Sequence, residues 1–200
     1  MILPNKNMTK EFLDLGLQPL ANKYLTKKKN LNNNKKLYQL RVGFDKVTKL
    51  VSLLNKIPDK KMFDNTYPYK SSMSKTMINS FKDLSVEIKK KFKPKLLLEI
   101  GSNDGALIKN FDKDKVICVE PCSNLAKITK RKGYKTYDNF WNDSLAKKIK
   151  KKFRKVDVIY SANTITHIND LNNVFKSISF ILKNNGVLII EDPSLLDCIK

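Results

Sequence analysis

The stretch that decides the fold is Leu96-Leu97-Leu98-Glu99-Ile100-Gly101-Ser102-Asn103-Asp104-Gly105, an apolar run that ends in two glycines four positions apart. A run of this kind predicts a buried strand that leads into a ligand-binding loop. Val116 to Val119 form a second apolar run, which ends in Glu120. Backbone amides of the loop suit a charged ligand end, and a carboxylate after the next strand suits ribose hydroxyls. The two runs together predict one half of a nucleotide-binding α/β unit that holds an adenosyl cofactor.

The spacing of the loop residues excludes two other nucleotide-binding classes. Gly101 lets the backbone approach a ligand without a β-carbon in the way, and Gly105 does the same one turn later. Ser102 and Asn103 add polar atoms and amides at the expected start of a helix, where a carboxylate or amino group can be held. The pattern differs from the Gly-x-Gly-x-x-Gly fingerprint, and the chain has no Gly-Lys-Ser/Thr phosphate loop. Dehydrogenase and nucleoside triphosphatase functions are therefore disfavoured.

Strand and helix patterns alternate from residue 71 to the end of the sequence, which predicts a Rossmann-like α/β domain with a parallel sheet and right-handed crossovers. A helix capped by Ser72 or Ser74 is expected to end at Pro94. Residues 1–70 lack a long helical period and are expected to form a separate, irregular N-terminal module. The further elements predicted are strands 95–100, 116–120, 134–137, 156–161 and 187–191, and helices 104–111, 123–132, 142–152 and 170–183.

A net charge of +21, from 40 basic and 19 acidic residues, would ordinarily indicate a nucleic-acid partner. Only three of the basic residues are arginines, although planar recognition of phosphate and guanine favours arginine. The densest lysine cluster, residues 147–155, falls late on a predicted helix, where cations complement the helix C-terminus. We therefore expect a solvated basic surface, and a nucleic-acid methyltransferase or binder is the rival interpretation.

The sequence shows no apolar run near the roughly 20 residues that cross a bilayer and no signal-peptide stretch at its start. We expect no membrane contact and a cytoplasmic location. Cys118, Cys122 and Cys198 are few, and their spacing fits neither a disulfide framework nor a usual zinc knuckle. Reduced thiols that pack in the interior are the expected state.

Four separated blocks resemble a known family: residues 12–25, residues 62–74, residues 99–105 with 119–121, and residues 163–168. The first contains Leu-Asp-Leu-Gly-Leu-Gln-Pro-Leu-Ala-Asn, the second Tyr-Pro-Tyr-Lys-Ser-Ser-Met-Ser, and the last Asn-Thr-Ile-Thr-His-Ile. They are similar to class I S-adenosylmethionine-dependent methyltransferases, specifically the sugar C-methyltransferases that act on nucleotide-linked keto-deoxysugars. The resemblance implies S-adenosylmethionine as cofactor and a nucleotide-sugar as substrate.

The resemblance also assigns roles. His167 is expected to be an acid/base helper, and Tyr67 or Tyr69 is expected to position the substrate. The alternatives are a half-exposed histidine without chemistry and two rings that only pack between the modules. For the segment at 139–141, ordinary packing of aromatic side chains in the core is the alternative to contact with the cofactor. The residues expected to bind the cofactor are Glu99, Gly101, Ser102, Asn103, Gly105, Glu120, Pro121, Asn139, Phe140 and Asn163.

The sequence departs from the family pattern at both ends. The resemblance implies zinc on Cys-x-x-Cys pairs in the N-terminal module, but these cysteines are missing here, and Asp45 and Thr48 stand about where one pair would be. Since threonine cannot replace a thiolate ligand, we expect no structural zinc and no other metal. The family also continues past the fifth strand, so we expect this chain to be a truncated form. A rival interpretation is that the chain is a non-catalytic remnant. An exposed sheet edge at strand 187–191 would allow self-association.

Overall fold

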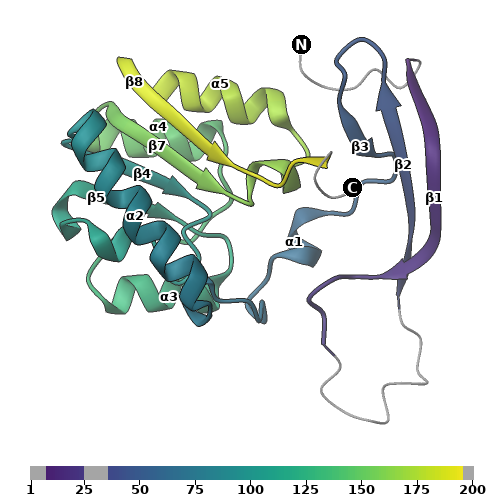
Figure 1. The fold of residues 1–200 in the computed structure, drawn as a ribbon, viewed down its shortest axis with the longest axis horizontal. Coiled ribbons are helices and arrows are strands. Elements are labelled where there is room, and N and C mark those ends of the chain that lie inside the picture. The colour runs from purple at the N-terminus through teal and green to yellow at the C-terminus, as the bar shows by residue number, and fades with distance from the viewer. Residues whose placement is uncertain (1–7, 25–35, 196–200) are drawn as a thin grey trace.

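The computed structural model describes residues 8–24 and 36–195 and contains two sheets (Figure 1). The first is a three-stranded antiparallel sheet of order β1-β2-β3, formed by β1 (Thr9–Pro19), β2 (Leu37–Asp45) and β3 (Val51–Leu53). The short helix α1 (Asp59–Met62) lies in the segment that leads from this sheet to the second. The N-terminal part is thus more regular than expected, because β1 and β2 pair over most of their length. The division at residue 70 stays a prediction.

The second sheet has five parallel strands in the order β6-β5-β4-β7-β8. This order and the helices between the strands confirm the predicted Rossmann-like fold class. The strand order reverses around β4, because β5 lies on one side of it and β7 on the other, and such a switch point is where open α/β sheets bind ligands. The strands are β4 (Leu97–Ile100), β5 (Val116–Val119), β6 (Lys135–Tyr137), β7 (Val156–Ala162) and β8 (Leu182–Glu191), and the helices are α2 (Lys75–Phe92), α3 (Ser123–Arg131), α4 (Asp143–Phe153) and α5 (Leu171–Ile181).

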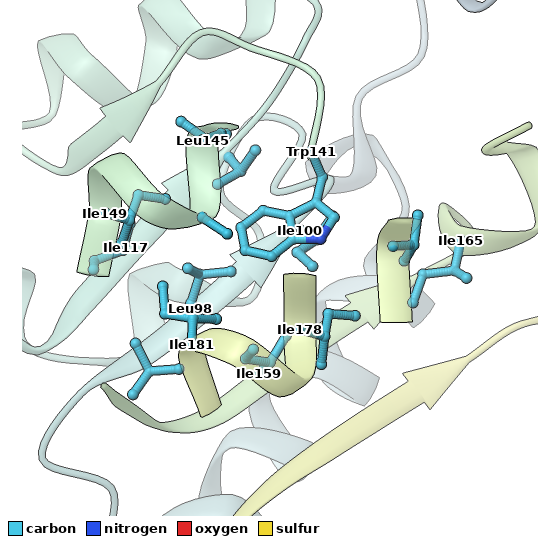
Figure 2. Close-up of a cluster of buried hydrophobic side chains, with 14 residues drawn as sticks. Leu98, Ile100, Ile117, Trp141, Leu145, Ile149, Ile159, Ile165, Ile178 and Ile181 are labelled. Atoms are coloured by element: carbon cyan, nitrogen blue, oxygen red, sulfur yellow. The ribbon is translucent and has the colours of Figure 1, made fainter. Parts of the chain in front are cut away.

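The central strands β4 and β5 are buried on both faces, and successive residues of each strand point to opposite sides. Leu98 and Ile100 of β4 face a core formed with α4 and α5, and Figure 2 shows side chains of this core converging around Trp141. Leu97 faces the opposite side, where Phe81 and Ile88 of α2 cover the sheet. Helices on both faces leave the carboxyl ends of the central strands as the place for a site.

The ends of the long helices follow the expected capping chemistry. The Ser74 hydroxyl accepts a hydrogen bond from the N–H of Met77 at 3.3 Å and caps α2, as predicted. At the other end Lys93 takes a left-handed conformation just before Pro94, which cannot continue a helix. The side chains of Asn142 and Asp170 cap α4 and α5 in the same way.

The predicted helix at 104–111 is wrong. The structure has turns there, followed by a single 3-10 turn at Ile108–Asn110. Asn103 and Gly105 have φ values of +48° and +88°, which lie outside the right-handed helical region. The carboxylate of Asp104 is also bound to Ser72, which holds the loop away from a helical path. A second difference is that β8 begins at Leu182, five residues earlier than the strand predicted at 187–191.

Among the described residues, no helix combines the length and the apolar character that crossing a membrane requires. Within the same part of the chain, β8 has a hydrogen-bonded neighbour on one side only, namely β7. Self-association through this edge stays a prediction. Cys118 and Cys122 are buried free thiols, as expected, and Cys198 lies outside the described residues.

Candidate functional site

A cavity of about 200 Å³ opens at the carboxyl ends of β4, β5 and β7. Gly101 follows β4, Glu120 follows β5 and Asn163 follows β7, and all three line the cavity. Tyr67 and Phe63, from the segment that leads out of the N-terminal sheet, line its other side. The cavity therefore lies at the strand-order switch point and is completed by residues that precede the parallel sheet.

Glu120 is held rigidly at the end of β5. It is only 4% exposed, and each carboxylate oxygen accepts a backbone N–H. Oε2 accepts from Asn103 at 2.7 Å, and Oε1 accepts from Cys122 at 2.8 Å. Burial raises the pKa of Glu120, and the two amide hydrogen bonds oppose that rise. Each oxygen retains a lone pair, so the carboxylate can accept further hydrogen bonds from a pair of hydroxyls.

Gly101 presents bare main chain between β4 and the segment after β7. Its φ is +78°, and its N–H donates to the carbonyl of Val119 at 2.8 Å. A β-carbon at this position would overlap Oγ1 of Thr164 and lie 2.8 Å from Cγ2 of the same residue. Only glycine satisfies both the backbone conformation and the close approach.

Three buried polar atoms without a hydrogen-bond partner belong to residues that line this cavity. They are Oε2 of Glu99, Oγ of Ser102 and Nε1 of Trp141. Buried polar groups are normally hydrogen-bonded, so unpaired ones in a cavity wall are suited to a polar ligand. Burial raises the pKa of Glu99 well above its usual range, and the charges of Glu120 and Asp104 add to the rise. A ligand with hydroxyls and a positive charge, such as S-adenosylmethionine, fits this donor and acceptor set.

The far side of the cavity is aromatic. The ring of Phe63 lies 5.6 Å from that of Tyr67 and 5.8 Å from that of His167, measured between centroids. Tyr69 lines the same cavity and is 46% exposed. The carboxylate of Asp59 also lines this side, and burial is the main cause of its raised pKa. Aromatic faces beside a carboxylate can hold a ring-shaped ligand that carries hydroxyl groups.

His167 ends the short turn Ile165–His167 after β7. Its N–H donates to the carbonyl of Thr164 at 3.0 Å, which fixes the backbone at the cavity edge. Asp192, beyond the end of β8, interacts electrostatically with His167. Burial raises the pKa of Asp192, while the hydroxyl of Thr166, at 3.1 Å from Oδ1, and the histidine oppose the rise. His167 therefore has a carboxylate neighbour within electrostatic reach.

Most residues predicted for the site line one cavity, and two do not. Gly105 and Asn139 lie outside the lining, so their contact with a cofactor stays a prediction without support from the geometry. Three further lining residues, Asp59, Phe63 and Thr164, are not among the predicted site residues, although Phe63 and Thr164 fall within the blocks 62–74 and 163–168. The predicted residues that the cavity brings together are Tyr67, Tyr69, Glu99, Gly101, Ser102, Asn103, Glu120, Pro121, Phe140, Asn163 and His167.

Residues 4–63 match a family described as a zinc binding domain, but the residues present do not fit zinc. The sequence has neither cysteine nor histidine between positions 4 and 63. In the part of the chain that the structure describes, no group of three or more His, Cys, Asp or Glu could hold a metal ion. The turn after β2 is closed instead by the buried carboxylate of Asp45, whose Oδ1 accepts the N–H groups of Val47 at 2.9 Å and Thr48 at 2.8 Å.

We expect purified protein to contain far less than one zinc per chain, because thiolate and imidazole ligands are missing from the N-terminal module. Thermal unfolding should be unchanged by a chelator, whereas structural zinc proteins lose stability when the metal is removed. Elemental analysis by mass spectrometry and unfolding with and without EDTA measure both quantities. One tightly held zinc per chain would contradict the expectation.

Solved structures of methyltransferases are similar to this chain at low sequence identity. The plantazolicin methyltransferase BpumL, solved with a pentazolic desmethylPZN analog and SAH, has a TM-score of 0.50 and 14% identity, over 68% of this chain and 54% of that one. An S-adenosylmethionine-dependent methyltransferase from Clostridium acetobutylicum has a TM-score of 0.43 and 21% identity, over 56% of this chain and 49% of that one. The first of these similarities supports the fold alone.

A curated relative and a family match bear on identity. Over 107 residues the chain is 27% identical to the C-methyltransferase NovU of Streptomyces niveus, which covers 52% of this chain. The chain spans 26% of the length of that relative. Residues 69–198, well over half of the chain, match the family described as a methyltransferase domain, and they include the cofactor loop, Glu120 and His167. The chain therefore belongs to the methyltransferase domain family.

Proposed function

We propose that the chain binds S-adenosylmethionine and takes part in C-methylation of a nucleotide-linked keto-deoxysugar. The observation that carries the proposal is the cavity that joins the Gly101 loop and Glu120 on one side to Tyr67, Tyr69 and His167 on the other. Similarity to the C-methyltransferase NovU supports carbon as the methylated atom. The nucleotide-sugar acceptor follows from the resemblance of residues 12–25 and 62–74 to sugar C-methyltransferases.

The cofactor side of the cavity would hold the adenosyl and methionine parts separately. Glu120 would accept the ribose hydroxyls, and the unpaired oxygens of Glu99 and Ser102 would bind the polar end of the methionine part. Phe140 and Trp141 would border the base. When bound, the cofactor supplies an electrophilic methyl group.

The acceptor side would prepare the carbon that receives the methyl group. Removal of a proton next to a ketone needs a base and a group that steadies the enolate oxygen. The imidazole of His167, with Asp192 near it, would take up the proton that leaves this carbon, and the ring of Phe63 lies 5.8 Å from the imidazole between centroids. The hydroxyls of Tyr67 and Tyr69 would position the sugar.

The cofactor assignment predicts that Glu120→Gln weakens binding of S-adenosylhomocysteine by about tenfold to a hundredfold, since hydrogen bonds to a charged group contribute about 1.5–3 kcal/mol. Calorimetric titration measures the affinity. Asp138→Asn is the matched control, because Asp138 pairs with Lys130 at 3.6 Å and does not line the cavity. The affinity of this variant for S-adenosylhomocysteine should stay close to that of the wild type. Undiminished binding by Glu120→Gln would remove the site from this position.

The acceptor assignment is tested by mass-detected methyl transfer to a panel of thymidine-diphosphate keto-sugars. His167→Asn should reduce transfer while sparing affinity for S-adenosylhomocysteine, because His167 lies on the acceptor side. Transfer to nucleic acid that survives physiological salt would instead favour the rival substrate class. Cofactor binding without transfer to any acceptor would favour a non-catalytic role. The acceptor class, the cytoplasmic location and self-association stay predictions.

A further inference from the structure

The side chain of Asn103 binds the backbone of the segment that carries the two tyrosines. Oδ1 accepts the N–H of Ser71 at 2.9 Å, and Nδ2 donates to the carbonyl of Tyr69 at 3.3 Å. Oδ1 also accepts the N–H of Asp104 at 2.9 Å. The polar atoms of this side chain are thus engaged within the protein, although the sequence predicts Asn103 as a cofactor contact.

The neighbouring residue strengthens the same attachment. Asp104 is only 3% exposed, and its Oδ1 accepts the N–H of Ser72 at 3.2 Å while its Oδ2 accepts the hydroxyl of Ser72. The consecutive residues Asn103 and Asp104 therefore bind the consecutive amides of Ser71 and Ser72, which lie 32 positions earlier in the sequence. Residues 67–72, here called the tyrosine segment, have a separate attachment at their start. There, Nδ2 of Asn124 on α3 donates to the carbonyl of Tyr67 at 2.8 Å.

The main chain of Asn103 is attached to the opposite side of the site. Its N–H donates to Oε2 of Glu120 at 2.7 Å, and its φ is +48°. Asparagine tolerates the left-handed region better than most residues. A continuous hydrogen-bonded path therefore runs from the Glu120 carboxylate through Asn103 to Ser71 and Tyr69.

We propose that Asn103 is a positioning residue that couples occupancy of the Glu120 carboxylate to the order of residues 67–72, so that cofactor binding prepares the acceptor side. This inference rests on the proposed cofactor site. A ligand that binds Glu120 restrains the N–H of Asn103, and the side chain passes that restraint to the tyrosine segment. The acceptor would then bind more tightly to the protein that already holds the cofactor, and the cofactor would bind more tightly to the protein that already holds the acceptor.

Hydrogen exchange of the peptide spanning residues 67–74, measured with and without S-adenosylhomocysteine, tests the coupling. In the wild type the ligand should slow exchange of this peptide by about tenfold, within the usual range of coupling between sites. Asn103→Gly keeps the backbone conformation and the N–H bound to Glu120 but loses the side chain. At saturating ligand this variant should exchange faster and lose the ligand-dependent slowing. Asn103→Asp, which retains both acceptor functions of Oδ1, should restore part of the slowing.

Asn124→Ala is the matched control, because it removes one attachment of the same segment without touching the path to Glu120. It should raise the exchange rate of residues 67–74 and keep the ligand-dependent slowing. Full slowing in Asn103→Gly at saturating ligand would overturn the coupling and leave the cofactor site standing. Failure of the wild type to bind S-adenosylhomocysteine would overturn the proposed function, and the coupling with it.

Discussion

Replacement of Gly101 by valine is expected to lower the affinity for S-adenosylhomocysteine by about a hundredfold or more, a loss of roughly 2.7 kcal/mol. The residue has a φ of +78°, where a β-branched side chain costs about 1–3 kcal/mol. The new side chain would also overlap Thr164, so either the loop or the segment after β7 must move. Both carry cavity residues, Ser102 on the loop and Asn163 beside Thr164. Calorimetry reports the affinity, and chemical unfolding reports the accompanying loss of stability.

Two further variants separate the causes. Gly16 has a φ of +66°, and no atom lies within 4 Å of the place that a β-carbon would take, so Gly16→Ala carries the backbone strain without an overlap. It should cost stability and leave ligand affinity unchanged. Combining Gly101→Ala with Thr164→Ala removes Oγ1 and Cγ2, the two nearest atoms, although Cβ of residue 164 stays 2.9 Å away. The double variant should recover part of the binding that Gly101→Ala alone loses. Wild-type affinity in Gly101→Val would show that the ligand does not use this loop.

The parallel sheet is predictable from the sequence because its strands are encoded locally. Leu97 points to one face of the sheet, and Leu98 and Ile100 point to the other. All three are apolar because helices cover both faces. Glu99 and Glu120 interrupt this pattern only where the strands reach the cavity. Breaks in a local pattern thus indicate residues of the cavity wall, and they do so without knowledge of which strands are neighbours.

The side of the cavity that we propose for the acceptor is not predictable in the same way, because its geometry depends on contacts distant in sequence. Asp59 and Phe63 belong to the segment after the N-terminal sheet, and nothing in their local sequence places them beside His167. The failed helix at 104–111 has the same cause. Its apolar residues fit a helical period, but Asp104 is committed to Ser72, which lies 32 positions earlier. Tertiary hydrogen bonds override local propensity at this loop.

Glu99→Gln is expected to change the pH dependence of stability more than any other single substitution of a carboxylate in the cavity. Glu99 is only 3% exposed, and its Oε2 has no hydrogen-bond partner. Burial raises its pKa well above the usual range, and the charges of Glu120 and Asp104 raise it further. Its neighbours across the sheet, Cys118 and Tyr160, carry no positive charge to offset this. An ionised Glu99 is therefore costly in the unliganded fold.

The sign of the effect follows from the difference between folded and unfolded chains. Below about pH 4.3 the carboxyl is protonated in both states and contributes nothing to the pH dependence. As the pH rises, the unfolded chain ionises while the folded chain keeps its proton, so stability falls by up to about 1.4 kcal/mol per pH unit. The fall ends at the raised pKa of the folded state. Glutamine cannot ionise, so Glu99→Gln removes this contribution to the slope.

Urea unfolding of the unliganded protein between pH 5 and pH 8 measures the effect. The stability of Glu99→Gln relative to wild type should rise steadily across this range, because the unfolded wild-type chain ionises at Glu99 while the folded chain keeps the proton. Glu87→Gln on the exposed face of α2 is the matched control and should leave the profile parallel to wild type. Bound S-adenosylmethionine should flatten the wild-type profile, because its positive charge favours the ionised carboxylate. Parallel profiles for wild type and Glu99→Gln would mean that the folded chain already accommodates the charge, and the unpaired oxygen would then not be a site held ready for a cation.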